Sequence, residues 1–118
     1  MLRASAENAN STVDLQVVTT PDFDSGVPNG KQLIDFADAV TGSSEDALER
    51  SRQALLDAMG SAALVQASAI AANFSMNDRA ANAIGIPMES MFLDDSVEFR
   101  EALGINRFPS ARNTLERS

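Results

Sequence analysis

A run of seventeen residues without a charged side chain, from Ser61 to Asn77, constrains the fold of this chain more than any other feature. Its larger apolar residues are spread around the whole circumference of a helix instead of forming one stripe, and this pattern is typical of a helix that is covered on several sides. We therefore expect a long helix from Ser61 to Ile84 at the centre of the fold. These apolar residues are Leu64, Val65, Ile70, Phe74 and Met76.

Clear start and stop signals bound this helix. Ser61 can cap the first free N–H groups, Gly85 permits the turn at the end, and Pro87 cannot continue a helix. The run is close to the ~20 apolar residues that cross a bilayer. However, Gln66 and Asn73 interrupt it, and much of the remainder is alanine, which makes the mean hydropathy too low for insertion. The sequence therefore predicts a helix packed against protein, with no membrane partner.

The composition fits one modest globular domain, because 118 residues with 44% apolar content leave room for a single core. Nine basic and seventeen acidic residues give a formal net charge of -8. This charge repels phosphate backbones, and the basic residues form no stripe. The sequence predicts no nucleic-acid partner.

Several residue types that carry chemistry are absent, since the chain contains no Cys, His, Trp or Tyr. Without thiols there is no thiolate nucleophile and no peroxide-reducing Cys pair. Without imidazole there is no ordinary zinc site and no Ser-His relay. We expect no catalytic residue, no metal site and no cofactor, and thiol peroxidase activity is excluded. The amino terminus lacks the apolar core of a secretory signal, which predicts a cytoplasmic location.

The first thirty residues predict a flexible or extended amino-terminal arm, and residues 31–118 predict a single all-α domain. Met1–Ser11 is polar and small, with too little apolar surface to offset the entropy of ordering. Thr12–Thr20 alternates apolar and polar residues and is rich in β-branched types, so it predicts one short strand or an extended arm. Pro21–Gly30 is a loop by its proline and glycine content.

Two helices are expected before the central one. Lys31–Val40 reads as a short amphipathic helix. A second helix is capped by Ser43 or Ser44, carries acidic residues in its first turn, and is closed by Gly60. The central helix follows almost at once, and such a short connection makes neighbouring helices antiparallel or sharply angled.

One more helix is expected near the carboxyl terminus. Asp95 is followed three positions later by Glu98, which resembles a capping box. This helix should end at Leu103, because Gly104 follows.

The segment from Phe74 to Pro87, FSMNDRAANAIGIP, resembles the carboxy-terminal half of alkylhydroperoxidase D-like and carboxymuconolactone decarboxylase-like proteins. In that family the long helix commonly reads Phe, Asn, two apolar residues, Asn, Arg, a variable residue, Ala, Asp, two more, Gly, Ile or Val, Pro. The resemblance covers roughly Gln32 to Pro87. The positions that match are Phe74, Arg79, Ala81, Gly85, Ile86 and Pro87, while Ser75, Asp78 and Asn82 depart from the pattern.

The resemblance implies an all-α fold, a small helical bundle like half of the alkylhydroperoxidase D-like fold, that assembles into oligomers. The family's redox site is a Cys pair with nearby His and Glu on helices that precede the matched region. This chain has neither Cys nor His. The resemblance therefore implies the fold without its chemistry, and a cysteine-bearing relative as a possible partner.

Two functional hypotheses follow, and each has its own residues. The first is an oligomerisation or accessory protein, a homodimer, because the small residues of the central helix let another helix approach closely. The expected interface consists of Ala63, Ala67, Ile70, Ala71 and Phe74.

The second hypothesis is a small-molecule-binding protein or carboxylate-based enzyme with a pocket near Asp78 and Arg79. The Arg79 guanidinium could bind a carboxylate ligand, with Asn77 beside it, although a salt bridge is the commoner role of such a pair. Gln66, Asn73 and Asn77 form a polar stripe that either lines a pocket or fixes the register of two packed helices.

Overall fold

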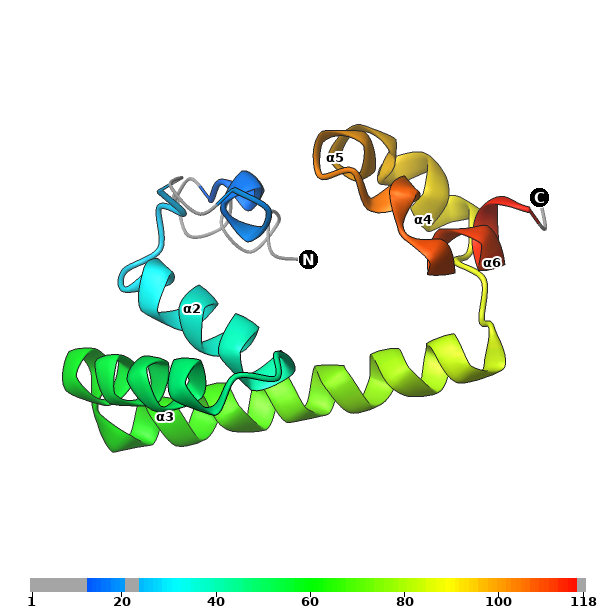
Figure 1. Ribbon diagram of the computed structural model, residues 1–118. Coiled ribbons are helices and arrows are strands. Elements are labelled where there is room, and N and C mark those ends of the chain that lie inside the picture. Colours follow the sequence, from blue (N-terminus) through cyan, green and yellow to red (C-terminus); the bar gives the residue numbers. More distant parts are fainter. Residues whose placement is uncertain (1–12, 21–23, 117–118) are drawn as a thin grey trace. The chain divides into compact units, whose positions relative to one another are not determined.

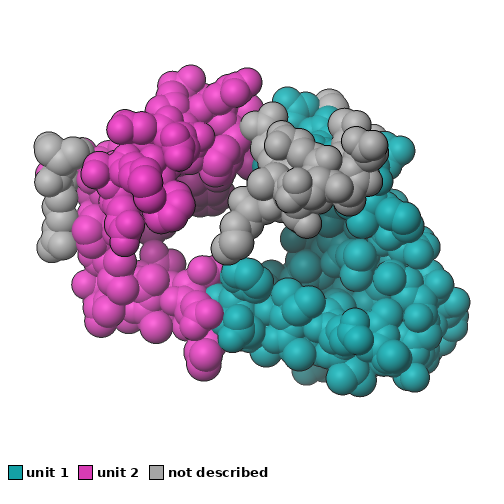
Figure 2. Space-filling view, turned by 180° about the vertical axis from the view of Figure 1, so that it is seen from behind, with its two compact units in different colours: residues 1–75 teal, residues 76–118 magenta. Residues whose placement is uncertain are grey.

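The computed structural model describes residues 13–20 and 24–116, and every regular element in these residues is a helix (Figure 1). The all-α prediction is therefore confirmed. The chain divides into two compact units, residues 1–75 and 76–118 (Figure 2). Each unit is described by itself below. The predictions for residues 1–11 and for the start of the loop, residues 21–23, lie outside the described residues.

The segment predicted as a strand or extended arm is instead a 3-10 helix, η1 (Leu15–Val18). The Asp14 carboxylate accepts a hydrogen bond from the Gln16 backbone N–H at 2.9 Å, and this side chain starts the turn. The Asp14 N–H in turn donates to the Ser25 carbonyl at 3.2 Å. Val17 is buried as a result. The alternating pattern was misleading because the described residues offer no second strand to pair with.

Helix α2 (Gly30–Thr41) confirms the predicted amphipathic helix and buries Phe36. A Cβ at its first residue, Gly30, would lie 1.9 Å from the Ser25 hydroxyl oxygen, so any larger residue there would displace that side chain. An exposed ion pair joins Lys31 to Asp35 one turn later, with 2.9 Å between Nζ and Oδ2.

Helix α3 (Glu45–Ile84) contains a break at Gly60, where φ is 81° and ψ is 173°. We call residues 45–59 the first arm and residues 61–84 the second arm. The Ser44 hydroxyl accepts from the Ala47 N–H at 3.3 Å and so caps the first arm. Of the two predicted caps, Ser43 and Ser44, the structure has Ser44. The chain reverses at Gly60, so the first arm and the start of the second lie side by side and antiparallel (Figure 1). The predicted boundary and the predicted reversal are both confirmed.

The prediction that the second arm is buried at the centre of the fold is wrong. Val65 is 68% exposed, Ile70 60% and Phe74 61%. Within residues 13–20 and 24–116, the buried apolar side chains are those of Val17, Phe36 and Leu55, which lie outside the second arm. The physical reason is the packing of the described residues, because the first arm covers one side of the second arm and no other described helix of unit 1 covers the rest.

Unit 2 begins with the end of the second arm, which stops as expected before Gly85 (φ 67°). Short helices follow, and apart from α5 the sequence reading did not anticipate them. They are α4 (Ser90–Asp95), α5 (Val97–Ala102), η2 (Ile105–Arg107), η3 (Pro109–Ala111) and α6 (Arg112–Leu115).

The predicted capping box at Asp95 is wrong, because Asp95 is the last residue of α4 and the N-cap of α5 is Ser96. The Ser96 side chain makes no capping bond. Its hydroxyl oxygen instead accepts from the Arg100 Nε–H at 2.8 Å. The end of α5 was placed within one residue, since the chain turns at Gly104 (φ 66°).

Candidate functional site

The second arm of α3 presents apolar residues that stay exposed among the described residues of unit 1. Residues 61–75 meet the first arm with one side of the helix, and the half-buried residues are Ala63, Leu64, Ala67, Ser68, Ala71 and Ser75. The Ser68 hydroxyl donates to the Leu64 carbonyl at 2.8 Å, so this polar group is satisfied within the helix. Ile70 and Phe74 lie on another side of the same helix and stand mostly in solvent.

Four of the five predicted interface residues share one stripe of the second arm. Ala63, Ala67, Ile70 and Phe74 follow one another at spacings of four, three and four, which places them on one side of a helix. The fifth, Ala71, lies closer to the side that the first arm covers. The assignment of all five residues to an interface stays a prediction.

The residues of the second hypothesis, Asn77, Asp78 and Arg79, lie in the part of α3 that belongs to unit 2, and all three are exposed. The pockets described below are lined by other residues. Ligand binding by these three side chains stays a prediction.

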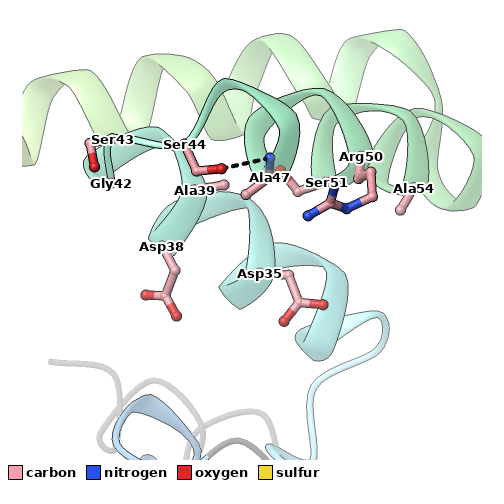
Figure 3. A pocket seen from close by; sticks show the side chains of 10 residues that line it. All are labelled: Asp35, Asp38, Ala39, Gly42, Ser43, Ser44, Ala47, Arg50, Ser51 and Ala54. Atoms are coloured by element: carbon pink, nitrogen blue, oxygen red, sulfur yellow. Dashed lines mark hydrogen bonds between the residues drawn. The ribbon is translucent and has the colours of Figure 1, made fainter.

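An open pocket of about 520 Å³ lies between α2 and the first arm (Figure 3). Asp35 and Asp38 reach it from α2, and Arg50 reaches it from the first arm (Figure 3). The three charged residues are exposed, and Asp35 is already paired with Lys31. A polar ligand in this pocket competes with water for every contact, because exposed charges interact weakly. The lining is completed by Ala39, Gly42, Ser43, Ser44, Ala47, Ser51 and Ala54.

The sequence analysis missed a polar centre in unit 2 around Arg100, which is buried to 7% exposure. Its guanidinium donates from Nη1 to the Asn106 side-chain oxygen and from Nη2 to the Leu93 carbonyl, each at 2.8 Å, in addition to the bond to Ser96. The acceptors come from α4, η2 and the residue between α4 and α5, so one side chain ties these segments together. The spacing of four between Ser96 and Arg100 is the signal that could have indicated this contact.

An apolar hollow of about 380 Å³ adjoins this centre in unit 2. Ile86, Met88, Ile105 and Phe108 are its large apolar lining residues, and the hydroxyl of Thr114, which also lines it, accepts from the Met88 N–H at 2.8 Å. It contains no ionisable side chain, so acid–base catalysis has no group to act there. The hollow is a consequence of packing short helices whose apolar residues stay partly exposed.

In residues 13–20 and 24–116, no group of three or more acidic side chains is placed to hold a metal ion. By length and composition α3 is long and apolar enough to cross a membrane, and only 6% of its most apolar 18-residue window is buried. The expectation that its mean hydropathy is too low is therefore not confirmed. One such helix does not distinguish a membrane span from a helix that another protein covers.

No protein-family model matches this sequence, and no curated protein or solved structure is significantly similar to it. The resemblance to alkylhydroperoxidase D-like proteins accordingly stays a prediction.

Proposed function

We propose that this chain is a non-catalytic assembly protein that forms a homodimer through the second arm of α3. The observation that supports this most is the exposure of Ile70 and Phe74 one turn apart in the uncharged segment 61–77. Single exposed apolar residues are normal on a protein surface, whereas neighbouring ones on a smooth face are typical of an interaction site.

The small core is a second argument for a partner. Among the described residues, three apolar side chains are buried, those of Val17, Phe36 and Leu55. A chain of this size has to bury a large share of its apolar surface to offset the entropy of folding. A dimer contributes the missing burial, since anything that binds only the folded state stabilises it.

The charge distribution favours a second copy over a charged partner. The net charge of -8 repels another copy over most of the surface, but residues 61–77 carry none of that charge. Two copies can therefore approach through this face at the lowest electrostatic cost. A strongly basic or acidic partner would gain nothing from it.

The polar residues of the second arm favour a protein partner over a lipid one. In a bilayer the side-chain amides of Gln66 and Asn73 would lose their water and find no partner, which costs several kcal/mol for each. At a protein interface the same amides can hydrogen-bond to one another.

Sedimentation equilibrium at micromolar concentrations tests the proposal, and we expect the mass of a dimer. Ile70→Asp should convert the dimer into monomers, because it buries a charge in the interface. Val65→Asp is the matched control, since Val65 is equally exposed on a different side of the same arm. A wild-type monomer would overturn the proposal. Flotation of the wild-type chain with liposomes would also overturn the proposal and would indicate a membrane role.

The second hypothesis, a ligand pocket near Asp78 and Arg79, gains no specific observation, nor does a cysteine-bearing partner. Both stay predictions. A thermal-shift screen with small carboxylates tests the first of them, because a ligand of the folded state raises the melting temperature.

A further inference from the structure

We infer that the two copies pair their second arms antiparallel, with Phe74 packed against the partner's Ala63 and Ile70 packed against the partner's Ala67. This inference rests on the proposed homodimer and adds the orientation and the register of the contact. It concerns residues 61–75 only, which lie entirely within unit 1.

We call Ala63, Ala67, Ile70 and Phe74 the seam. Their spacings of four, three and four residues give a mean repeat of about 3.7, close to the 3.6 residues of a helical turn, which places all four on one side of the helix. At 3.6 residues per turn, the seam lies about a quarter turn away from the side of the helix that faces the first arm. In the chain itself Ile70 and Phe74 are exposed while Ala63 and Ala67 are half-buried, so a second copy would reach the two large residues fully and the two alanines only through the part of their surface that stays exposed.

Charges do not choose the orientation of the pair, because residues 61–77 contain none. The orientation of the pair is therefore decided by the volumes of the seam side chains. Along the chain the seam runs small, small, large, large: two alanines, then isoleucine and phenylalanine. Interfaces pack best when large side chains meet small ones at every level.

A parallel pair does not place large side chains against small ones. It would place alanine against alanine in two layers, then Ile70 and Phe74 against their own copies in the next two. The helices would have to approach closely at one end and splay at the other, which leaves voids or strain.

An antiparallel pair places a large side chain against a small one in all four layers. Phe74 and Ile70 of one copy meet the partner's Ala63 and the partner's Ala67, and the twofold axis repeats both contacts. Each layer then holds one alanine and one large side chain, so the distance between the helix axes stays constant.

The polar stripe supports the same arrangement. Gln66 and Asn73 lie seven residues apart, on one flank of the seam. In the antiparallel register Gln66 lies beside the partner's Asn73, where the two amides can exchange hydrogen bonds. In a parallel pair the two positions lie on opposite sides of the contact.

Crosslinking tests the inference cleanly because the chain has no cysteine of its own. We would make three single-cysteine variants, Gln66→Cys, Asn73→Cys and Ala63→Cys, which all keep the large seam residues. Each variant would be treated alone with a short bismaleimide crosslinker. An equal mixture of Gln66→Cys and Asn73→Cys would be treated in the same way after subunit exchange. Ala63 and the partner's Ala63 would be about 16 Å apart along the axis in the antiparallel pair, from eleven residues at about 1.5 Å each, and adjacent in a parallel one.

We expect more crosslinked dimer from the mixture of Gln66→Cys and Asn73→Cys than from Gln66→Cys alone, and none from Asn73→Cys or Ala63→Cys alone. Crosslinking of Ala63→Cys with itself would show a parallel pair and overturn the inference. No crosslinking in any sample from a protein that sediments as a dimer would overturn the register while the proposed function stands. A wild-type monomer in sedimentation equilibrium would overturn the proposed function itself.

Discussion

Replacing Leu55 tests how strongly unit 1 depends on its small core. Leu55 lies on the first arm with 0% of its surface exposed. Leu55→Ala removes three carbon atoms, and at about 0.8 kcal/mol for each buried carbon the lost transfer energy is about 2.4 kcal/mol. The cavity left behind adds to this, so we expect a total loss of about 3–4 kcal/mol. For a domain whose stability is of the order of 5–15 kcal/mol, that is a large fraction.

Urea unfolding followed by circular dichroism at 222 nm measures this loss. The titration has to be repeated at several protein concentrations, because dimer formation contributes to stability by mass action. Met59→Ala is the control, since Met59 lies one turn later on the same side of the helix and is 37% exposed. If Leu55→Ala were no more destabilising than Met59→Ala, the core assigned to unit 1 would be wrong.

Four further predictions concern other parts of the chain. Ile70→Ala should weaken the dimer about a hundredfold, because each copy loses about 1.4 kcal/mol of burial, whereas Val65→Ala should leave its Kd unchanged in sedimentation. Arg100→Met should cost about 2–3 kcal/mol, seen as faster hydrogen exchange in residues 90–107, because three acceptors lose their donor. Gly60→Ala should lower the free energy of unfolding measured in urea by about 1–3 kcal/mol, because its φ and ψ suit only glycine. Lys31→Ala should change stability by less than about 1 kcal/mol, because its ion pair is exposed.

The sequence predicted those elements that local chemistry determines. The helix boundaries at Ser44, Gly60, Gly85 and Gly104 were all placed correctly or within one residue, because a cap or a glycine acts on the backbone beside it. The same reasoning failed at Asp95, where the neighbouring Ser96 is engaged by Arg100. Such a contact depends on how the next helix folds back.

The candidate site also combines residues that the sequence predicts with contacts that only the packing of helices creates. The residues of the seam are visible in the sequence, since their spacing follows from the helical repeat. The pocket between α2 and the first arm was not anticipated, because Asp38 and Arg50 are brought together only when the two helices pack. The short helices after Pro87 also escaped notice, since segments of three to six residues carry too little periodicity to recognise.

The sequence by itself determined that this chain is helical, where its long helices break, and that one of them carries an uncharged apolar surface. Only the tertiary structure decided which part of that surface is covered. Periodicity records the sides of a helix that are apolar, but burial depends on how many neighbours the chain can supply. Here the first arm covers one side of residues 61–75, and Ile70 and Phe74 are left exposed.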